Sequence, residues 1–471
     1  MQCSRNETVS QGIQPGRRQF LGAAAVGAVS VVGAGRVSGQ ETDGATEIEN
    51  WHDLDAVRDG LDSSYLLVSD LDEESAGYDE YIGETSDGWD PIGQADPHSD
   101  VDTVFAGQFD GNGHEITGLV IDRPAAENVG LFSGNEGVIE GVTLTDCDVA
   151  GKWKVGGLVG LNTGTINDAS VEGTVAGEEW IGGLIGHHEG ELETATASAE
   201  VRGGKVVGGL AGIVPRGTVR DATAHGRVTG TSSVGGLLGE AWGTVRQTFA
   251  DATVDGEEAV GGLVGKCFEE NGVAESRAIG DVTGDWGVGG LVGWNVGEAI
   301  RDVAASGAVT GTDGVGGLVG SNEGTVTEAY ANGEVTGIRD VGGVAGRTLD
   351  DGEITNAYWD TGTTEKSVGV GSGDGDVTGL ETERMRGETA RQEMTALDFE
   401  RTWTVVTDPD DYPALQWQTP NPPRTVEAGD EQRTEDTDSG DENGVGFGIG
   451  SAVTGLCSYL LKQNYVEDRQ E

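Results

Sequence analysis

The sequence predicts an all-β protein: a parallel β-solenoid of about ten coils with short helical caps at its ends. A pattern typified by VGGLVG at Val155–Gly160 starts ten times between Val129 and Val368, at steps of 26 to 28 residues. Each unit also holds three short β segments joined by Gly and Asn corners, with no helical periodicity between them. A period this constant is typical of coils that bury their apolar faces against neighbouring coils.

Residues 1–39 are predicted to be a twin-arginine signal peptide. Arg17 and Arg18 precede the uncharged run Gly22–Gly35, which is shorter than a membrane-spanning helix and rich in Gly and Ala. A basic pair followed by a short apolar run is the pattern of this export signal. We therefore expect the chain to be exported.

Residues 40–128 are expected to form an N-terminal cap and the first irregular coils. Apolar residues at Trp51, Leu54, Val57 and Leu61 follow helical spacing, which predicts an amphipathic helix of about three turns. A helix here would plug the open end of the stack, because exposed strand edges would otherwise pair with other molecules.

A turn is predicted at Asp110–His114, where Gly111, Asn112 and Gly113 accept positive φ angles. The same stretch, together with Glu115, can also be interpreted as an acid/base cluster. We favour the turn.

The array itself is assigned to residues 129–373. Matching β-branched and aliphatic residues are expected to stack as two internal ladders. One ladder comprises Val155, Ile181, Val207 and Val234; the other comprises Ile166, Leu192, Val219 and Val245. Strict alternation along VGGLVG would turn one apolar residue outward unless the strand bends. We expect a bend at Gly156-Gly157.

Three segments follow the array. Residues 374–419 are expected to be a C-terminal cap, with a helix inside Glu381–Phe399 and a strand at Trp403–Val406. Residues 420–443 are rich in Pro, Asp, Glu, Thr and Ser, which predicts a disordered acidic linker. Residues 444–471 begin with an apolar stretch and are expected to be a sorting or anchor-like tail.

Composition excludes some classes of partner. The chain has 82 acidic and 28 basic residues, a net charge of −54, which repels nucleic acid and anionic lipid. We expect no nucleic-acid partner, and membrane contact only through the C-terminal tail. Charge of this size strains a fold in ordinary saline but is screened at molar salt, and it resembles that of proteins from salt-adapted archaea.

No cofactor or metal site is expected. Cys147 and Cys267 lie more than four coils apart, so they should not form a disulfide. His187 and His188 should face opposite sides of a strand and make poor joint metal ligands. Gly371–Asp376 has the Gly/Asp composition of a calcium-binding turn, but in a single imperfect copy, so this alternative is less favoured.

The recurring [VI]GG[LV][VIAL]G with a trailing NxGxI resembles the GLUG repeat of bacterial and archaeal surface proteins. The segments Trp89–Gly93, Phe105–His114 and Ala357–Asp360 resemble those that flank such repeats. The resemblance covers about Ile48 to Trp417. It implies a cell-surface or extracellular adhesin-like solenoid, and it carries no catalytic residues to transfer.

Three tryptophans are the candidate ligand-binding residues. Trp153, Trp180 and Trp286 each lie one or two residues before a VGGLVG copy, so at equivalent corners they would form a surface row on which sugar rings could stack. They could instead simply cover glycine-rich corners. We expect a non-catalytic, exported surface protein that mediates adhesion or binds polysaccharide or other envelope components. The alternatives are a polysaccharide lyase or glycoside hydrolase on the same solenoid, and a purely structural envelope spacer.

Overall fold

The computed structural model describes residues 44–93, 103–268, 272–297, 299–349, 351–406, 408 and 411–419. These all belong to one compact unit, which ends at Pro420. The predicted signal peptide with Arg17 and Arg18, the linker 420–443 and the tail 444–471 lie outside the described residues. Within the described residues, no helix is long and apolar enough to cross a membrane.

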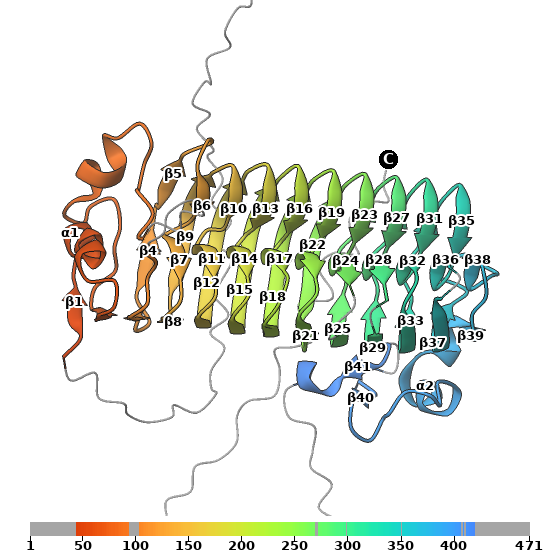
Figure 1. Cartoon of the computed structure of the whole chain (residues 1–471). Helices are drawn as coiled ribbons and strands as arrows, with labels where there is room; N and C mark the ends of the chain where they lie inside the picture. Colours follow the sequence, from red (N-terminus) through yellow and green to blue (C-terminus); the bar gives the residue numbers. More distant parts are fainter. Residues whose placement is uncertain are drawn as a thin grey trace, which may run out of the picture. The chain divides into compact units, whose positions relative to one another are not determined.

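The described residues form three parallel sheets that wrap the chain into stacked coils (Figure 1). We name these sheets A, B and C. Sheet A comprises β1 (Thr46–Ile48), β2 (Ser64–Leu67), β3 (Gln108–Asp110), β4 (Glu115–Thr117), β5 (Val120–Asp122), β8 (Val138–Glu140), β9 (Thr143–Ala150), β12 (Thr165–Ala176), β15 (Glu191–Arg202), β18 (Thr218–Thr229), β21 (Thr244–Arg246), β22 (Phe249–Asp255), β25 (Val273–Ala278), β26 (Val282–Thr283), β29 (Ala299–Ala305), β30 (Val309–Thr310), β33 (Thr325–Ala331), β34 (Val335–Thr336), β37 (Glu353–Asp360) and β39 (Val377–Leu380).

The other two sheets hold the strands on either side of the double glycine. Sheet B comprises β7 (Phe132–Asn135), β11 (Val159–Asn162), β14 (Ile185–His188), β17 (Ala211–Val214), β20 (Leu238–Ala241), β24 (Val264–Phe268), β28 (Val292–Val296), β32 (Val319–Asn322), β36 (Ala345–Thr348) and β38 (Val370–Ser372). Sheet C comprises β6 (Glu127–Val129), β10 (Trp153–Val155), β13 (Glu179–Gly182), β16 (Lys205–Gly208), β19 (Ser232–Gly235), β23 (Glu258–Gly261), β27 (Trp286–Gly289), β31 (Asp313–Gly316) and β35 (Arg339–Gly342).

The predicted solenoid of about ten coils is confirmed, and so are its internal ladders. In sheet C, Val155 pairs with Ile181, and the column continues through Val207 and Val234. In sheet A, the column of Ile166, Leu192, Val219 and Val245 has the same in-register pairing. Residues one repeat apart therefore stack on each other, because every coil is one strand spacing above the last.

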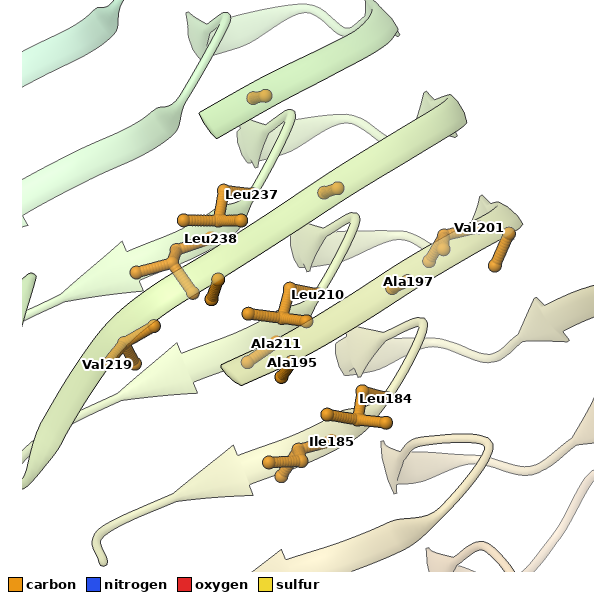
Figure 2. Packing of buried hydrophobic residues seen from close by; sticks show 14 of the residues in the cluster. Leu184, Ile185, Ala195, Ala197, Val201, Leu210, Ala211, Val219, Leu237 and Leu238 are labelled. Atoms are coloured by element: carbon orange, nitrogen blue, oxygen red, sulfur yellow. The ribbon is translucent and has the colours of Figure 1, made fainter. Parts of the chain in front are cut away.

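The bend expected at the double glycine is also confirmed. Strand β10 ends at Val155 and β11 begins at Val159, and Val155, Leu158 and Val159 are all fully buried. Figure 2 shows the equivalent pairs Leu184–Ile185, Leu210–Ala211 and Leu237–Leu238 repeating along successive coils. The break between strands lets consecutive apolar residues both point inward, which a straight strand does not allow.

A column of residues with left-handed backbone geometry lies within the strands of sheet C. Its members are Asn128, Lys154, Trp180, Val206, Ser233, Ala259, Gly287, Gly314 and Asp340, with φ between 50° and 66°. Left-handed geometry costs an L-residue about 1–2 kcal/mol. The column nevertheless contains residue types that seldom adopt it, including a β-branched valine. Because the column repeats in each coil, the stacking of coils enforces this conformation whatever the side chain.

We expect Gly287→Ala to lower the free energy of unfolding by about 1 kcal/mol, because alanine disfavours positive φ. Space is not the cause, since an added Cβ would find its nearest atom 3.6 Å away. The measurement is denaturant unfolding at molar salt. Gly287→Asn is the control and should cost less, because asparagine tolerates this geometry. Equal losses in the two variants would contradict the conformational explanation.

The N-terminal helix is shorter than expected. α1 (Trp51–Asp55) is followed by a 3-10 turn, η1 (Ala56–Asp59), so the prediction of a helix of about three turns is wrong in length. Gly60 follows, and glycine is a poor helix former. Trp51, Leu54 and Val57 are nevertheless buried against the first coil, and Asn50 caps the helix by accepting from two backbone amides. A short π-helix, η2 (Asp79–Gly83), lies in the same cap.

Residues 374–419 do not all cap the C-terminal end. Of these residues, β39 completes sheet A at that end, next to β38, which lies just before residue 374 and completes sheet B. The remainder, 381–419, returns over the outer face of sheet A, and we name it the return arm. It contains η3 (Thr382–Arg384), α2 (Gly387–Glu393), η4 (Gln416–Gln418) and an antiparallel pair, β40 (Trp403–Thr404) with β41 (Ala414–Leu415).

Hydrogen bonds anchor the return arm to coils well before the last one. The Tyr330 hydroxyl donates to the Pro413 carbonyl over 2.6 Å, and the Trp417 indole N–H donates to the Glu275 carbonyl over 2.8 Å. The reason lies in one outward column of sheet A, which changes from Thr196 and Thr223 to larger rings at Tyr330 and Tyr358. Large rings facing outward favour a cover, because burying apolar surface is stabilising.

Candidate functional site

The candidate site is a strip where the outer sides of sheets C and B meet, which we name the seam. One side of the seam is the left-handed column from Lys154 to Asp340. The other side is the outward column of sheet B: Leu161, His187, Ile213, Glu240, Lys266, Trp294, Ser321 and Arg347. The left-handed residue of each coil faces the sheet-B residue seven positions later. That geometry brings side chains from every coil into one continuous strip.

Trp180 and His187 form one part of the seam. Their rings meet edge to face with centroids 5.8 Å apart, and the Lys154 ammonium lies 5.7 Å from the Trp180 centroid. His187 Nε2 lies 2.9 Å from a carboxylate oxygen of Glu189, which also pairs with Arg216. Burial lowers the pKa of His187, so the imidazole is largely neutral near pH 7.

The next two coils give the seam an apolar stretch and then a carboxyl group. Val206 and Ile213 are 7% and 9% exposed although both project away from the core. Ser233 Oγ donates to Glu240 Oε1 over 2.8 Å. Burial raises the pKa of Glu240, while the Ser233 hydrogen bond and the Lys266 charge act in the opposite direction.

An aromatic cluster around Lys266 follows. The Lys266 ammonium lies 4.5 Å from the Trp294 centroid and 4.8 Å from that of Phe268. Phe268 stacks on Trp242 with centroids 4.0 Å apart and planes 14° apart. The Trp294 indole N–H donates to Glu323 over 3.1 Å. Three successive coils therefore present aromatic rings on one face, with a cation over two of them.

The far part of the seam is an ion-pair network. Asp313 is 1% exposed and pairs with Arg339 at 2.7 Å and with Arg347. Arg347 Nε also donates to Asp340 over 2.6 Å. Because two arginines satisfy this buried carboxylate, the network rigidifies the seam rather than offering a free charge.

The three tryptophans predicted from sequence do not form one row. Trp153 pairs with Glu179, so Trp180 lies one residue further along its strand and belongs to the left-handed column. Trp286 shares the column of Trp153 but lies five coils away, about 24 Å. Trp153 lies under Lys152, and Trp286, 50% exposed, lies under Arg339. The expected row is therefore wrong, because a one-residue offset moves a side chain to the neighbouring column.

The aromatic cluster of Trp242, Phe268 and Trp294 was not among the residues predicted from sequence. These rings follow the double glycine rather than precede it, and their positions hold Leu, His, Ile, Glu or Pro in other coils. Aligning the copies on their glycines and comparing the residues four and six positions after the second glycine would have brought them together. The aromatic substitutions were visible in the sequence, but they lay outside the VGGLVG motif.

The paired histidines face opposite sides, as expected. His188 is fully buried and replaces an asparagine of an internal polar column: its Nδ1 lies 2.9 Å from Asn162 Nδ2, and its Nε2 donates to the Thr218 carbonyl over 3.1 Å. In other coils of this column, Asn135 donates to Asn162, and Asn295 to Asn322. Within the described residues, no cluster of three or more His, Cys, Asp or Glu could hold a metal. The described cysteines, Cys147 and Cys267, are buried and not disulfide-bonded.

Two neighbouring carboxyl groups with raised pKa values have the chemistry of an acid/base pair. Burial raises the pKa of both Asp302 and Glu328, and each lies at the left-handed position of its strand in adjacent coils. Asp302, however, is 3% exposed and accepts hydrogen bonds from the Trp403 indole over 3.2 Å and from Arg301 over 3.0 Å. Asp302 thus anchors the return arm and is buried by it.

Comparison with known proteins gives limited matches. The GLUG motif family matches residues 153–176 and 284–310. Halomucin of Haloquadratum walsbyi is 38% identical over 134 residues, 27% of this chain and 1% of the halomucin sequence. A chain of Evansella cellulosilytica named as a Gly-rich membrane protein is 35% identical over 132 residues, 26% of this chain and 14% of that one. The alignments thus span small parts of these relatives.

A Bacteroides ovatus crystal structure named after an immunoglobulin A1 protease covers 80% of this chain and 93% of its own, at 17% identity and a TM-score of 0.30. A similarity at that level carries no argument about function. The family match falls on the same units that form the coils: residues 153–176 span β10 to β12, and residues 284–310 span β27 to β30. The chain therefore carries GLUG-motif repeats, and each repeat is one coil of a parallel β-solenoid.

Proposed function

We propose that the chain is an exported, non-catalytic surface repeat protein that binds polysaccharide or other envelope components along the seam. The observation that carries this proposal is the aromatic cluster of Trp242, Phe268 and Trp294 on three successive coils. Sugar rings stack on such faces because their C–H surfaces are apolar and the aromatic face is electron-rich. Coils spaced about 4.8 Å apart provide a regular platform for an extended chain.

Similarity to halomucin and to a Gly-rich membrane protein supports a surface location. The acidic composition supports a function in concentrated salt, where a net charge of −54 is screened. Catalysis on a sugar chain needs two carboxyl groups about 5–10 Å apart that reach the substrate. In the Asp302–Glu328 pair, Asp302 is buried and bonded to Trp403 of the return arm, which favours binding over hydrolysis or lyase chemistry.

The test is a glycan-binding screen of the exported chain at molar salt, with wild type compared with Trp294→Ala and Trp180→Ala. Both variants should lose most glycan retention, whereas Thr253→Ala, at an exposed side chain of β22 in sheet A and so outside the seam, should not. A reducing-end assay on the same mixtures distinguishes binding from cleavage. Retention of glycan by both tryptophan variants would refute the seam as the binding site. Release of reducing ends by wild type would replace the proposal with the enzymatic one.

A further inference from the structure

We propose that the ligand of the seam is an acidic polysaccharide, whose carboxylate or sulfate groups are bound by the Lys266 ammonium while its rings stack on Trp294 and Trp180. This inference rests on the proposed function and names the ligand class of the same site. The observation behind it is that three described lysines lie over aromatic rings and form no salt bridges.

Lysines and arginines differ in ion pairing in this molecule, although arginines such as Arg339 also lie over rings. Among the described residues, every salt bridge uses an arginine or a histidine as the cation, and none uses a lysine. Lys152, Lys154 and Lys266 instead lie over aromatic rings. In a chain with 82 acidic residues, a lysine without a carboxylate partner is unexpected on composition alone.

Lys266 is the clearest example of a lysine that lies over aromatic rings without a salt bridge. Its ammonium has three hydrogen-bond donors and makes no hydrogen bond or ion pair within the described residues. Trp294 and Phe268 fix its position from below, at 4.5 Å and 4.8 Å. The nearest carboxyl group in register, Glu240, accepts a hydrogen bond from Ser233 instead. The ammonium is therefore held over two rings and has no carboxylate partner among the described residues.

A second lysine–tryptophan pair lies along the same strip. Lys154 lies over Trp180, and Trp180 is four coils from Trp294, about 19 Å. Between the two pairs lie the apolar side chains of Val206 and Ile213 and then Glu240, which accepts a hydrogen bond from Ser233. Two cation–aromatic positions about 19 Å apart fit a chain of several sugars that carries negative charges at intervals.

Long-range charge does not prevent this binding under the conditions that suit the molecule. At low salt the net charge of −54 repels a polyanion from a distance. At molar salt the screening length falls to about 3 Å, so charges beyond direct contact contribute little. Contact with Lys266 then decides the preference for acidic over neutral polysaccharide, because a charge-assisted hydrogen bond acts within that distance.

The experiment compares a polyuronate, a sulfated glucan and a neutral glucan as ligands of the exported chain at molar salt. Wild type is expected to bind the two acidic polymers more tightly than the neutral one. Lys266→Gln should weaken acidic binding about tenfold more than neutral binding, since a lost charge-assisted contact has about this effect. Lys205→Gln, at an exposed lysine with no aromatic ring beneath it, is the matched control and should change neither.

The outcomes separate this inference from the function on which it rests. Loss of all binding in Trp294→Ala, with unchanged acidic binding in Lys266→Gln, would overturn the acidic ligand and keep the seam as a glycan site. Absence of binding of any polymer to wild type would overturn both. A weaker response to one acidic polymer than to the other identifies carboxylate or sulfate as the group that Lys266 takes. Far-UV circular dichroism of each variant checks that the fold is retained.

Discussion

Replacing Gly235 with alanine is expected to lower the free energy of unfolding by more than about 4 kcal/mol, enough to prevent folding of the affected coils. A Cβ at this position would lie 1.9 Å from the Leu238 carbonyl oxygen and 2.6 Å from the Gly265 amide nitrogen. Both atoms belong to the backbone, so neither can move aside as a flexible side chain would. The methyl group would instead force open the corner between β19 and β20 and push away the next coil, which breaks ladder hydrogen bonds.

The measurement is chemical unfolding at molar salt, followed by far-UV circular dichroism. Ser232→Ala is the matched control, because it lies in the same strand, β19, and its outward side chain is only partly buried. It should change stability by less than about 0.5 kcal/mol. A fully folded Gly235→Ala protein with wild-type stability would show that the double glycine is not required for close approach of the coils.

Much of the solenoid could be predicted from the sequence because stacking makes the repeat explicit. Each coil contacts mainly its neighbours, so the 26-to-28-residue period fixes which residues pair, and the ladders of Val155 and Ile166 followed directly. The bend at Gly156-Gly157 followed from the number of apolar residues that needed burial. These predictions depended on local pattern and on one translation along the stack.

The left-handed column of sheet C could not be predicted from the repeat period. Position 206 is a valine and position 259 an alanine, residues whose own preferences oppose positive φ. Their conformation comes from the path that the stacked neighbours impose, so tertiary structure overrides local preference. This column is one side of the seam, and no local pattern therefore indicated that side chains such as Trp180 and His187 face each other.

The return arm and the aromatic cluster were missed for a different reason. Their signals are deviations between copies rather than features shared by the copies. Tyr330 and Tyr358 replace the threonines of earlier coils, and Trp294 stands where earlier coils have Leu, His, Ile, Glu or Lys. In a repeat protein, shared residues report the scaffold, while residues that differ from the consensus report what covers or binds it.

His188 should make the protein sensitive to mild acid. Burial lowers its pKa from 6.5 to about 4 in the folded protein, whereas in the unfolded chain the pKa returns to about 6.5. Above pH 6.5 the imidazole is neutral in both states, and its contribution to stability is complete. Below that value the unfolded chain binds a proton that the folded protein excludes, so stability falls until about pH 4. The total loss is about 3 kcal/mol, because stability falls by about 1.4 kcal/mol for each pH unit between the two pKa values.

His188→Asn isolates this effect, because it restores the residue that Asn295 and Asn322 supply in later coils and keeps a partner for Asn162. The free energy of unfolding is measured at pH 7 and at pH 4.5 for wild type and variant at the same salt concentration. The carboxyl groups titrate alike in both proteins, so the difference between the two pH dependences reports on position 188. We expect wild type to lose about 2 kcal/mol more than the variant over this interval. His225→Asn, at a half-exposed histidine, is the control; if it reduces the acid loss as much as His188→Asn does, burial of His188 is not the cause.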